Sequence, residues 1–232
     1  MPTISSPLRR VALGAFLLAS CSAFAFSLSD ISNQEATSGL KAALEKGANT
    51  AVAKLGQQNG FLNNDKVKIK LPGALEQAMP LIRMTGQGQK VDDLVVDMNH
   101  AAEAAVPMAK PLLVNAVKSM SVSDAKNILS GGDTSVTDFF RQKTSGDLAA
   151  KFLPIVKKIT DKNGLSSRYN ATMGQVAKTG LVSGDQSTVE GYVTQRALDG
   201  LFLMIGEEEK AIRKDPVGSG SAIIGKVFGA IK

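Results

Sequence analysis

The sequence lacks tryptophan and contains one cysteine, Cys21, and one histidine, His100, among its 232 residues. A lone cysteine excludes an internal disulfide, and a single histidine without a cysteine pair excludes the usual zinc ligand sets. Aromatic residues make up only 5% of the chain. Small and aliphatic side chains must therefore fill the core, which is typical of closely packed helices.

Strong charge of either sign is also missing. The chain has 27 basic and 21 acidic residues, a formal net charge of +6, and it is 44% hydrophobic. These proportions are typical of a globular domain. The basic residues are interleaved with acidic ones and aromatic stacking platforms are lacking, so we do not expect nucleic acid as a partner.

The first residues have the pattern of an export signal. Arg9 and Arg10 precede an uninterrupted apolar run from Val11 to Ala19. A short positive region followed by an apolar stretch of this length is typical of a signal peptide. Without the two arginines the chain keeps 25 basic and 21 acidic residues, a net charge of +4. We therefore predict an exported protein located in the periplasm.

Two cleavage patterns overlap in this segment, and both stay open. An A-x-A site ends at Ala25, which would make residues 1–25 a signal peptide. The sequence Leu-Ala-Ser-Cys over residues 18–21 has the form of a lipobox. In that alternative residues 1–20 are removed and Cys21 carries a lipid, which would attach the protein to the outer membrane.

Beyond the signal, helical patterns dominate, and we predict one all-α domain over residues 26–232. Ser32 and Glu35 form a capping box, and apolar residues recur at helical spacing, which predicts a helix or helix pair over Asn33–Leu55. Glycine and proline divide the rest of the chain. The further helices are expected near residues 74–84, 89–105, 112–120, 122–129, 134–143, 146–162, 165–178, 191–214 and 221–231.

The stretch Ala197–Gly206, ALDGLFLMIG, is apolar on every side of a helix except at Asp199. It is too short for a membrane span, which needs about 20 residues. We therefore predict a central helix surrounded by others, in a compact multi-helix domain. A lone carboxylate there needs either a cation, such as Arg141, Arg168 or Arg196, or an opening to a pocket that could bind an apolar ligand.

One segment near residues 60–72 does not look helical. Lysine alternates with apolar residues from Lys66 to Leu71, the period of an extended strand with one wet face. No second strand pattern accompanies it, so the segment is interpreted as an extended arm or as half of a small hairpin. Its lysines, at positions 66, 68 and 70, could keep a strand edge from pairing, or contact lipid phosphate or an acidic partner.

Motifs for catalysis, cofactors or metals find little support. Residues 220–226 fit G-x-x-x-x-G-K, but Val227 replaces the required Ser or Thr and no strand precedes the motif, which favours a hinge before a short helix. His100 has Asp97 and Glu103 at helical spacing, which indicates a surface hydrogen bond. The row Glu207–Glu209 is interpreted as a solvated face paired with Lys210 and Arg213. We assign no catalytic, cofactor-binding or metal-binding residue.

Several stretches together resemble a known family. These stretches are GFLNNDKVKIKLP at 60–72, AVPMAKPLLVNAVKSMSVSDAKNILSGGDTSVTDFFRQKT at 105–144, KFLPIV at 151–156 and YVTQRALDGLFLMIGEEEKAIRKDPVGSGS at 192–221. They are similar to the domain-of-unknown-function family numbered 4197, a family of exported bacterial proteins. The resemblance covers residues 28–228 and implies a single-domain exported protein. The family has no assigned catalytic or ligand-binding residues to transfer.

These observations predict an uncharacterised cell-envelope protein of Gram-negative type, a non-enzymatic helical module that binds an envelope protein or an apolar ligand. The alternative is an envelope hydrolase whose catalytic carboxylates the sequence does not identify. A deep pocket with converging polar groups would favour an enzyme or a ligand binder, whereas a closed core with an exposed patch would favour protein interaction.

Overall fold

The computed structural model describes residues 32–84, 86, 88–132, 134–163, 166–167, 169 and 188–229. Within these ranges the regular structure is helical and no strand occurs, which confirms the all-α prediction. The helices are α1 (Asn33–Leu55), α2 (Gly73–Met84), α3 (Gly88–Ala105), α4 (Ala109–Lys118), α5 (Val122–Ser130), α6 (Ser135–Thr160), α8 (Val189–Lys214) and α9 (Ala222–Gly229), with the 3₁₀ turns η2 (Val106–Met108) and η3 (Asp161–Asn163).

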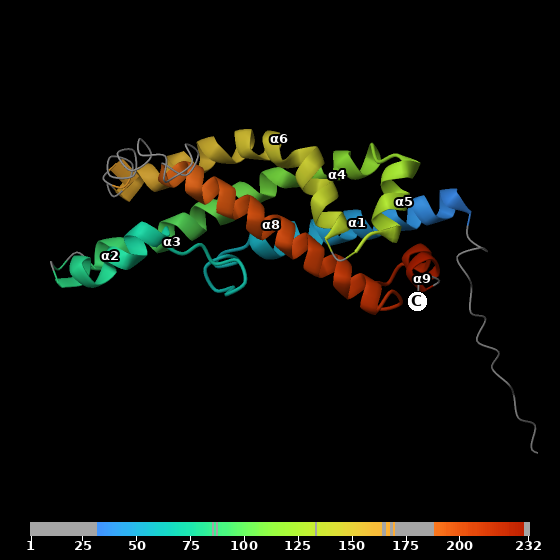
Figure 1. Cartoon of the computed structure of the whole chain (residues 1–232), viewed down its shortest axis with the longest axis horizontal. Coiled ribbons are helices and arrows are strands. Elements are labelled where there is room, and N and C mark those ends of the chain that lie inside the picture. The colour runs from blue at the N-terminus through green and yellow to red at the C-terminus, as the bar shows by residue number, and fades with distance from the viewer. Residues whose placement is uncertain are drawn as a thin grey trace, which may run out of the picture.

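The long helix α8 lies at the centre of the domain. It packs mainly against α6 and α1, and also against α3 and α9. Figure 1 shows α8 (orange) crossing the middle of an elongated bundle, with α2 at one end and α5 and α9 at the other. No helix in the described ranges has the length and hydropathy needed to cross a membrane.

The predicted burial of the α8 centre is confirmed. Leu201 is fully buried, and Phe202 and Ile205 are each 1% exposed. The helix is not covered on every side, however, because Leu203 is 43% exposed. A non-helical segment, described below, covers part of the α8 surface that the other helices leave open.

Helix α1 begins with the predicted capping box. The Glu35 N–H donates to Ser32 Oγ at 3.2 Å, and the Ser32 N–H donates to the Glu35 carboxylate at 3.2 Å. The helix is a single one and runs straight through Gly47, which the sequence marks as a weak point. Gly47 lies against α8, where an added Cβ would be 3.5 Å from Glu208 Cβ. Packing between the two helices therefore compensates for the low helix propensity of glycine.

The prediction of two segments at 134–143 and 146–162 is wrong, since α6 is one continuous helix. Phe140, Leu148 and Phe152 lie on a shared face of α6 and are all fully buried. Burying such side chains contributes about 1.5–3 kcal/mol each. This exceeds the cost of about 1 kcal/mol for glycine at position 146, so packing decides the outcome.

Several predicted features lie outside the described residues. They are the signal segment 1–25, with Cys21 and Ala25, most of the predicted helix 165–178, and Arg168. The last predicted helix is present as α9, and Gly220 before it has a positive φ of 70°. This left-handed conformation suits glycine and supports the interpretation of the segment as a hinge before a short helix.

The contact between α1 and α9 leads to a stability prediction. A Cβ added to Gly39 would lie 2.9 Å from Val227 Cβ and 3.0 Å from the Ile223 carbonyl oxygen. Neither atom can move without shifting α9, so Gly39→Ala should destabilise the fold by about 1–3 kcal/mol. Thermal unfolding should show a Tm lowered by roughly 3–10 °C.

Gly146→Ala is the matched control for Gly39→Ala. A Cβ at Gly146, an exposed position inside α6, would meet no atom within 4 Å. Because alanine is the better helix former, this variant should be stabilised by about 0.5–1 kcal/mol. Equal Tm values for the two variants would contradict the close packing of α9 on α1.

Candidate functional site

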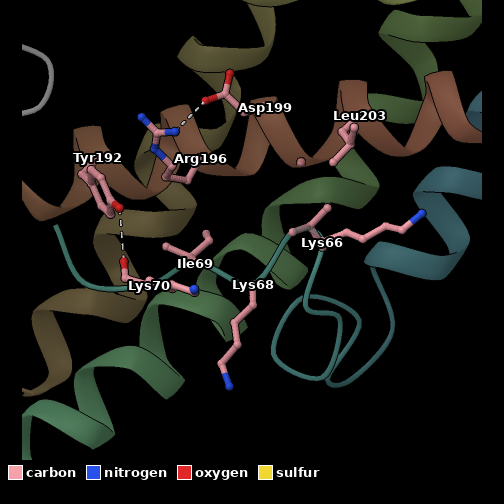
Figure 2. A pocket seen from close by; sticks show the side chains of 10 residues that line it. Lys66, Lys68, Ile69, Lys70, Tyr192, Arg196, Asp199 and Leu203 are labelled. Atoms are coloured by element: carbon pink, nitrogen blue, oxygen red, sulfur yellow. Dashed lines mark hydrogen bonds and ion pairs between the residues drawn. The ribbon is translucent and has the colours of Figure 1, made fainter. Parts of the chain in front are cut away.

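The segment Lys66–Leu71, here called the arm, lies between α3 and α8 (Figure 2). It begins in a turn over residues 65–67, where the N–H groups of Val67 and Lys68 donate to the Asn64 carbonyl, and only residues 68–71 run on as extended chain. Its apolar residues Val67, Ile69 and Leu71 are buried, whereas Lys66 and Lys70 are exposed and Lys68 is half-buried. The predicted alternation is therefore confirmed. The hairpin interpretation is wrong, because no strand in the described part of the chain pairs with the arm, and the extended interpretation holds for residues 68–71, after the turn.

A side-chain amide takes the place of the missing partner strand. The Ile69 N–H donates to Asn99 Oδ1 at 2.9 Å, and Asn99 Nδ2 donates to the Ile69 carbonyl at 2.9 Å. Asn99 Nδ2 also donates to the Val95 carbonyl at 2.7 Å, and the residue is fully buried. One amide therefore satisfies both backbone groups of Ile69, as a neighbouring strand would.

One turn further along α3, a buried carboxylate holds the loop before the arm. Glu103 Oε1 accepts from the N–H groups of Phe61 at 3.0 Å and Leu62 at 3.1 Å, and Oε2 accepts from Asn59 N–H at 3.0 Å. Glu103 is buried, and Phe61 is fully buried above it. Hydrogen bonds to an ionised acceptor are among the strongest in proteins, so this carboxylate fixes the loop conformation.

The predicted surface contact between Glu103 and His100 is wrong, because Glu103 is buried. His100 Nε2 lies 3.3 Å from Asn59 Oδ1 and 3.9 Å from Glu103 Oε2, so it touches only the outer edge of the buried cluster. Asn99 and Glu103 are four residues apart and interrupt the apolar stripe of α3 beside Met98. That interruption is the one sequence signal that could have identified them as buried polar residues.

On the other side, α8 meets the arm through Tyr192 and Arg196. The Tyr192 hydroxyl donates to the Lys70 carbonyl at 3.2 Å (Figure 2). The Arg196 guanidinium lies 5.4 Å from the centre of the Tyr192 ring. Burial raises the pKa of the Tyr192 phenol, more than the nearby Arg196 lowers it. The phenol therefore remains a hydrogen-bond donor at neutral pH.

A hollow of about 260 Å³ opens between the arm and α8. Its lining consists of Lys66, Val67, Lys68, Ile69 and Lys70 from the arm, and Tyr192, Arg196, Asp199, Gly200 and Leu203 from α8. Figure 2 shows the arm passing below α8, and it marks the ion pair between Arg196 and Asp199, which are both on α8. A wider depression of about 700 Å³ lies beside it, on the other side of Lys66, and is lined largely by the amide side chains of the loop.

Asp199, the residue that the sequence singled out, lies at the edge of this hollow. Its side chain is 37% exposed, and its Oδ2 lies 3.3 Å from Arg196 Nη1. Gln195 Nε2 donates to the other carboxylate oxygen at 3.1 Å. Of the proposed cations, Arg196 is the partner, whereas Arg141 pairs with Asp138 at 3.5 Å. The carboxylate is thus paired and beside a pocket at the same time.

Positive charge predominates around the hollow. Lys66 forms an ion pair of 2.6 Å with Glu207, and its hydrogen bond holds the pKa of that carboxyl below its usual value. Among the described residues, Lys68 and Lys70 form no ion pair. Figure 2 shows the Lys66 and Lys68 side chains pointing away from the hollow. The ammonium groups of these two lysines therefore lie outside the hollow and do not converge inside it.

The other carboxylates on α8 are engaged separately. Glu208 pairs with Lys54 of α1 at 2.6 Å, and Glu209 pairs with Arg213 as predicted. Glu209 is buried, which corrects the prediction that the whole row is solvated. Arg213 also donates to the Ile128 carbonyl at 3.2 Å and lies 5.5 Å from the centre of the Phe228 ring. This pair therefore links α8 to α5 and α9 and has a structural role.

Phosphate and metal chemistry receive no support from the geometry. Lys226, the lysine of the G-x-x-x-x-G-K pattern, forms a 2.7 Å ion pair with Glu35 of α1. Its hydrogen bond lowers the pKa of the Glu35 carboxyl to about 2, with further help from Ser32. In the part of the chain that the structure describes, no three side chains among His, Cys, Asp and Glu are grouped as metal ligands.

Fold and site together define a helical domain with an extended arm held across its central helix and a cationic hollow between them. The chain belongs to the family described as protein of unknown function (DUF4197), whose family model matches residues 30–229. No curated protein and no solved structure matches the chain. The family membership agrees with the resemblance in the sequence and adds no activity.

The amide of Asn99 should be required for the arm to stay in place. Asn99→Ala leaves the Ile69 N–H and carbonyl without partners, and each unsatisfied buried group costs about 1–3 kcal/mol. We expect a loss of about 2–4 kcal/mol in urea unfolding and faster hydrogen exchange at the Ile69 amide.

Asn127→Ala is the control for Asn99→Ala, because Asn127 is exposed on α5. Its replacement should change the free energy of unfolding by less than about 0.5 kcal/mol. An Ile69 amide that remains protected in Asn99→Ala would show that the amide is not what holds the arm.

Proposed function

We propose that this protein is exported to the cell envelope and binds an acidic partner at the arm, without catalysing a reaction. The observation that carries the proposal is that Lys68 and Lys70, two residues of the arm that line the hollow, have no ion pair among the described residues. Unpaired cations beside a rigid backbone favour acidic groups and reject basic ones. A binding surface needs such complementarity and no reactive group.

A hydrolase using paired carboxylates has less support. Such enzymes need two carboxyl groups about 5–10 Å apart, facing one substrate. Among the described residues, Asp199 is the only carboxylate that lines the hollow beside the arm. Glu207 and Glu208 are each bound to a lysine from a different segment. Asp199, Glu207 and Glu208 are therefore each held by a different cation and do not face one common point.

Export is the second part of the proposal, and it rests on the sequence of residues 1–25. Cys21→Ser distinguishes the two processing patterns. If Cys21 is lipidated, the native protein should sediment with membranes and the variant should be soluble in the periplasm. If cleavage follows Ala25, both should be soluble and begin at Phe26, as N-terminal sequencing would show. An unprocessed chain that stays in the cytoplasm would refute export.

Reversing the two arm charges tests acidic binding. Lys68→Glu combined with Lys70→Glu should weaken binding to soluble polyglutamate at least tenfold, or about 1.4 kcal/mol. Binding of the native protein should fall as salt is raised, because the cations are at the surface. Fluorescence polarisation with labelled polyglutamate measures both effects. Vesicles containing phosphatidylglycerol, used as a second probe, show whether lipid phosphate is bound instead.

The control makes the same change of net charge elsewhere. Lys110 on α4 and Lys126 on α5 are both exposed, and their replacement by Glu should reduce polyglutamate binding by no more than about twofold. An equal loss in both double variants would mean that the interaction follows net charge. The arm would then have no specific role, and the proposal would fail.

A further inference from the structure

The arm presents one satisfied and one open backbone edge. The Ile69 N–H and carbonyl face α3 and bind Asn99. The Lys68 N–H closes the preceding turn by donating to the Asn64 carbonyl at 2.8 Å. Beyond that turn the backbone groups of successive residues point to opposite sides, so the Lys68 carbonyl and the Lys70 N–H and carbonyl lie on the side away from α3. The Lys70 carbonyl accepts from Tyr192. Within the described residues, the Lys70 N–H and the Lys68 carbonyl have no hydrogen-bond partner.

These two groups have the spacing that an added strand uses. In a parallel sheet, a residue of one strand donates its N–H to the carbonyl of a residue on the neighbouring strand. Its own carbonyl accepts from the N–H of the residue two positions further along that neighbouring strand. Lys68 and Lys70 supply this carbonyl and this N–H on either side of Ile69. Because Asn99 already holds Ile69 from the opposite side, the open edge is pre-organised for such a partner.

The size of the hollow limits what can pair there. One end is closed by the Tyr192 hydroxyl on the Lys70 carbonyl. The other end is closed where Gly200 meets the arm, since a Cβ there would be 3.2 Å from Val67 Cβ. The volume between them, about 260 Å³, is below the usual range of about 300–1,000 Å³ for ligand pockets. This space suits the end of a chain and is too short for a long strand.

The charges decide which end of a chain fits. Asp199 engages one nitrogen of the Arg196 guanidinium, which leaves further N–H donors on that group. Lys70 adds a second cation among the residues that line the hollow, whereas the Lys68 side chain points outward. A free α-carboxylate is attracted to these cations, whereas a free α-amine is repelled. Exposed Leu203 offers an apolar surface for the last side chain.

We propose that the hollow binds the C-terminal residue of an extended peptide. The N–H of this residue donates to the Lys68 carbonyl. Its carboxylate accepts from the Lys70 N–H and is attracted by Arg196, and an apolar side chain lies against Leu203. This inference identifies the acidic group of the partner as a C-terminal carboxylate, and it rests on the proposed function of the arm.

Changes in the peptide test the site without altering the protein. The probes are fluorescein-labelled pentapeptides of the form Gly-Ser-Glu-Ser-Xaa, one for each amino acid at Xaa, measured by fluorescence polarisation. Peptides with an apolar last residue should bind with a Kd below about 1 mM. Amidating the C-terminal carboxylate, or methylating the N–H of the last residue, should each weaken binding at least tenfold, about 1.4 kcal/mol.

Two variants at one position separate the backbone from the side chain. Lys70→Pro removes both the ammonium group and the backbone N–H, and the preceding residue is already extended, as proline requires. Lys70→Ala removes the ammonium group alone. We expect Lys70→Pro to bind the best peptide at least tenfold more weakly than Lys70→Ala. Circular dichroism melting verifies folding, and if Lys70→Pro does not fold, the modified peptides still decide the question.

The outcomes distinguish this inference from the proposed function. If no peptide binds below about 1 mM, or if amides bind as well as acids, the C-terminal site is wrong. If Lys68→Glu with Lys70→Glu still loses polyglutamate binding in that case, the arm binds acidic groups without using its backbone edge. If neither peptide nor polyglutamate binding depends on the arm, both proposals fail.

Discussion

The structure depends on how two polar side chains of α3 hold a non-helical segment across the bundle. Asn99 binds the arm and Glu103 binds the loop before it. These contacts place Phe61 and Val67 against Gly200 of α8. The arm therefore covers part of the central helix that the neighbouring helices leave open. Without the two buried polar groups, the loop and arm would expose their own backbone and the apolar surface beneath them.

The attachment of the arm to α3 also creates the surface that we assign to binding. The arm is fixed along its α3 edge, but it is only as long as one short strand, so it touches α8 at its ends and leaves a hollow between. Its outward positions are lysines, which remain in water while the alternate residues are buried. A rigid backbone edge and unpaired charge are thereby brought together at one place.

Local patterns allowed much of the fold to be predicted. The capping box at Ser32, the helical spacing over Asn33–Leu55 and the alternation in the arm depend on neighbours in the chain, and all three are confirmed. The break near Gly146 was predicted wrongly, because helix propensity is weak compared with the packing of a long buried face. The partners of Asn99 lie 30 residues away in the chain. Pairing over such a distance leaves no periodic signal.

Taken by itself, the sequence determined the helical class, the apolar centre of α8, the alternating burial of residues 66–71 and the family. These properties follow from composition and short-range periodicity, which act before the chain is compact. Only the tertiary structure decided that Glu103 is buried, that Asp199 lies at an open edge and that the arm has one free backbone side. The reason is physical: burial and hydrogen-bond partners are properties of segments that meet in space, and a single segment does not encode them.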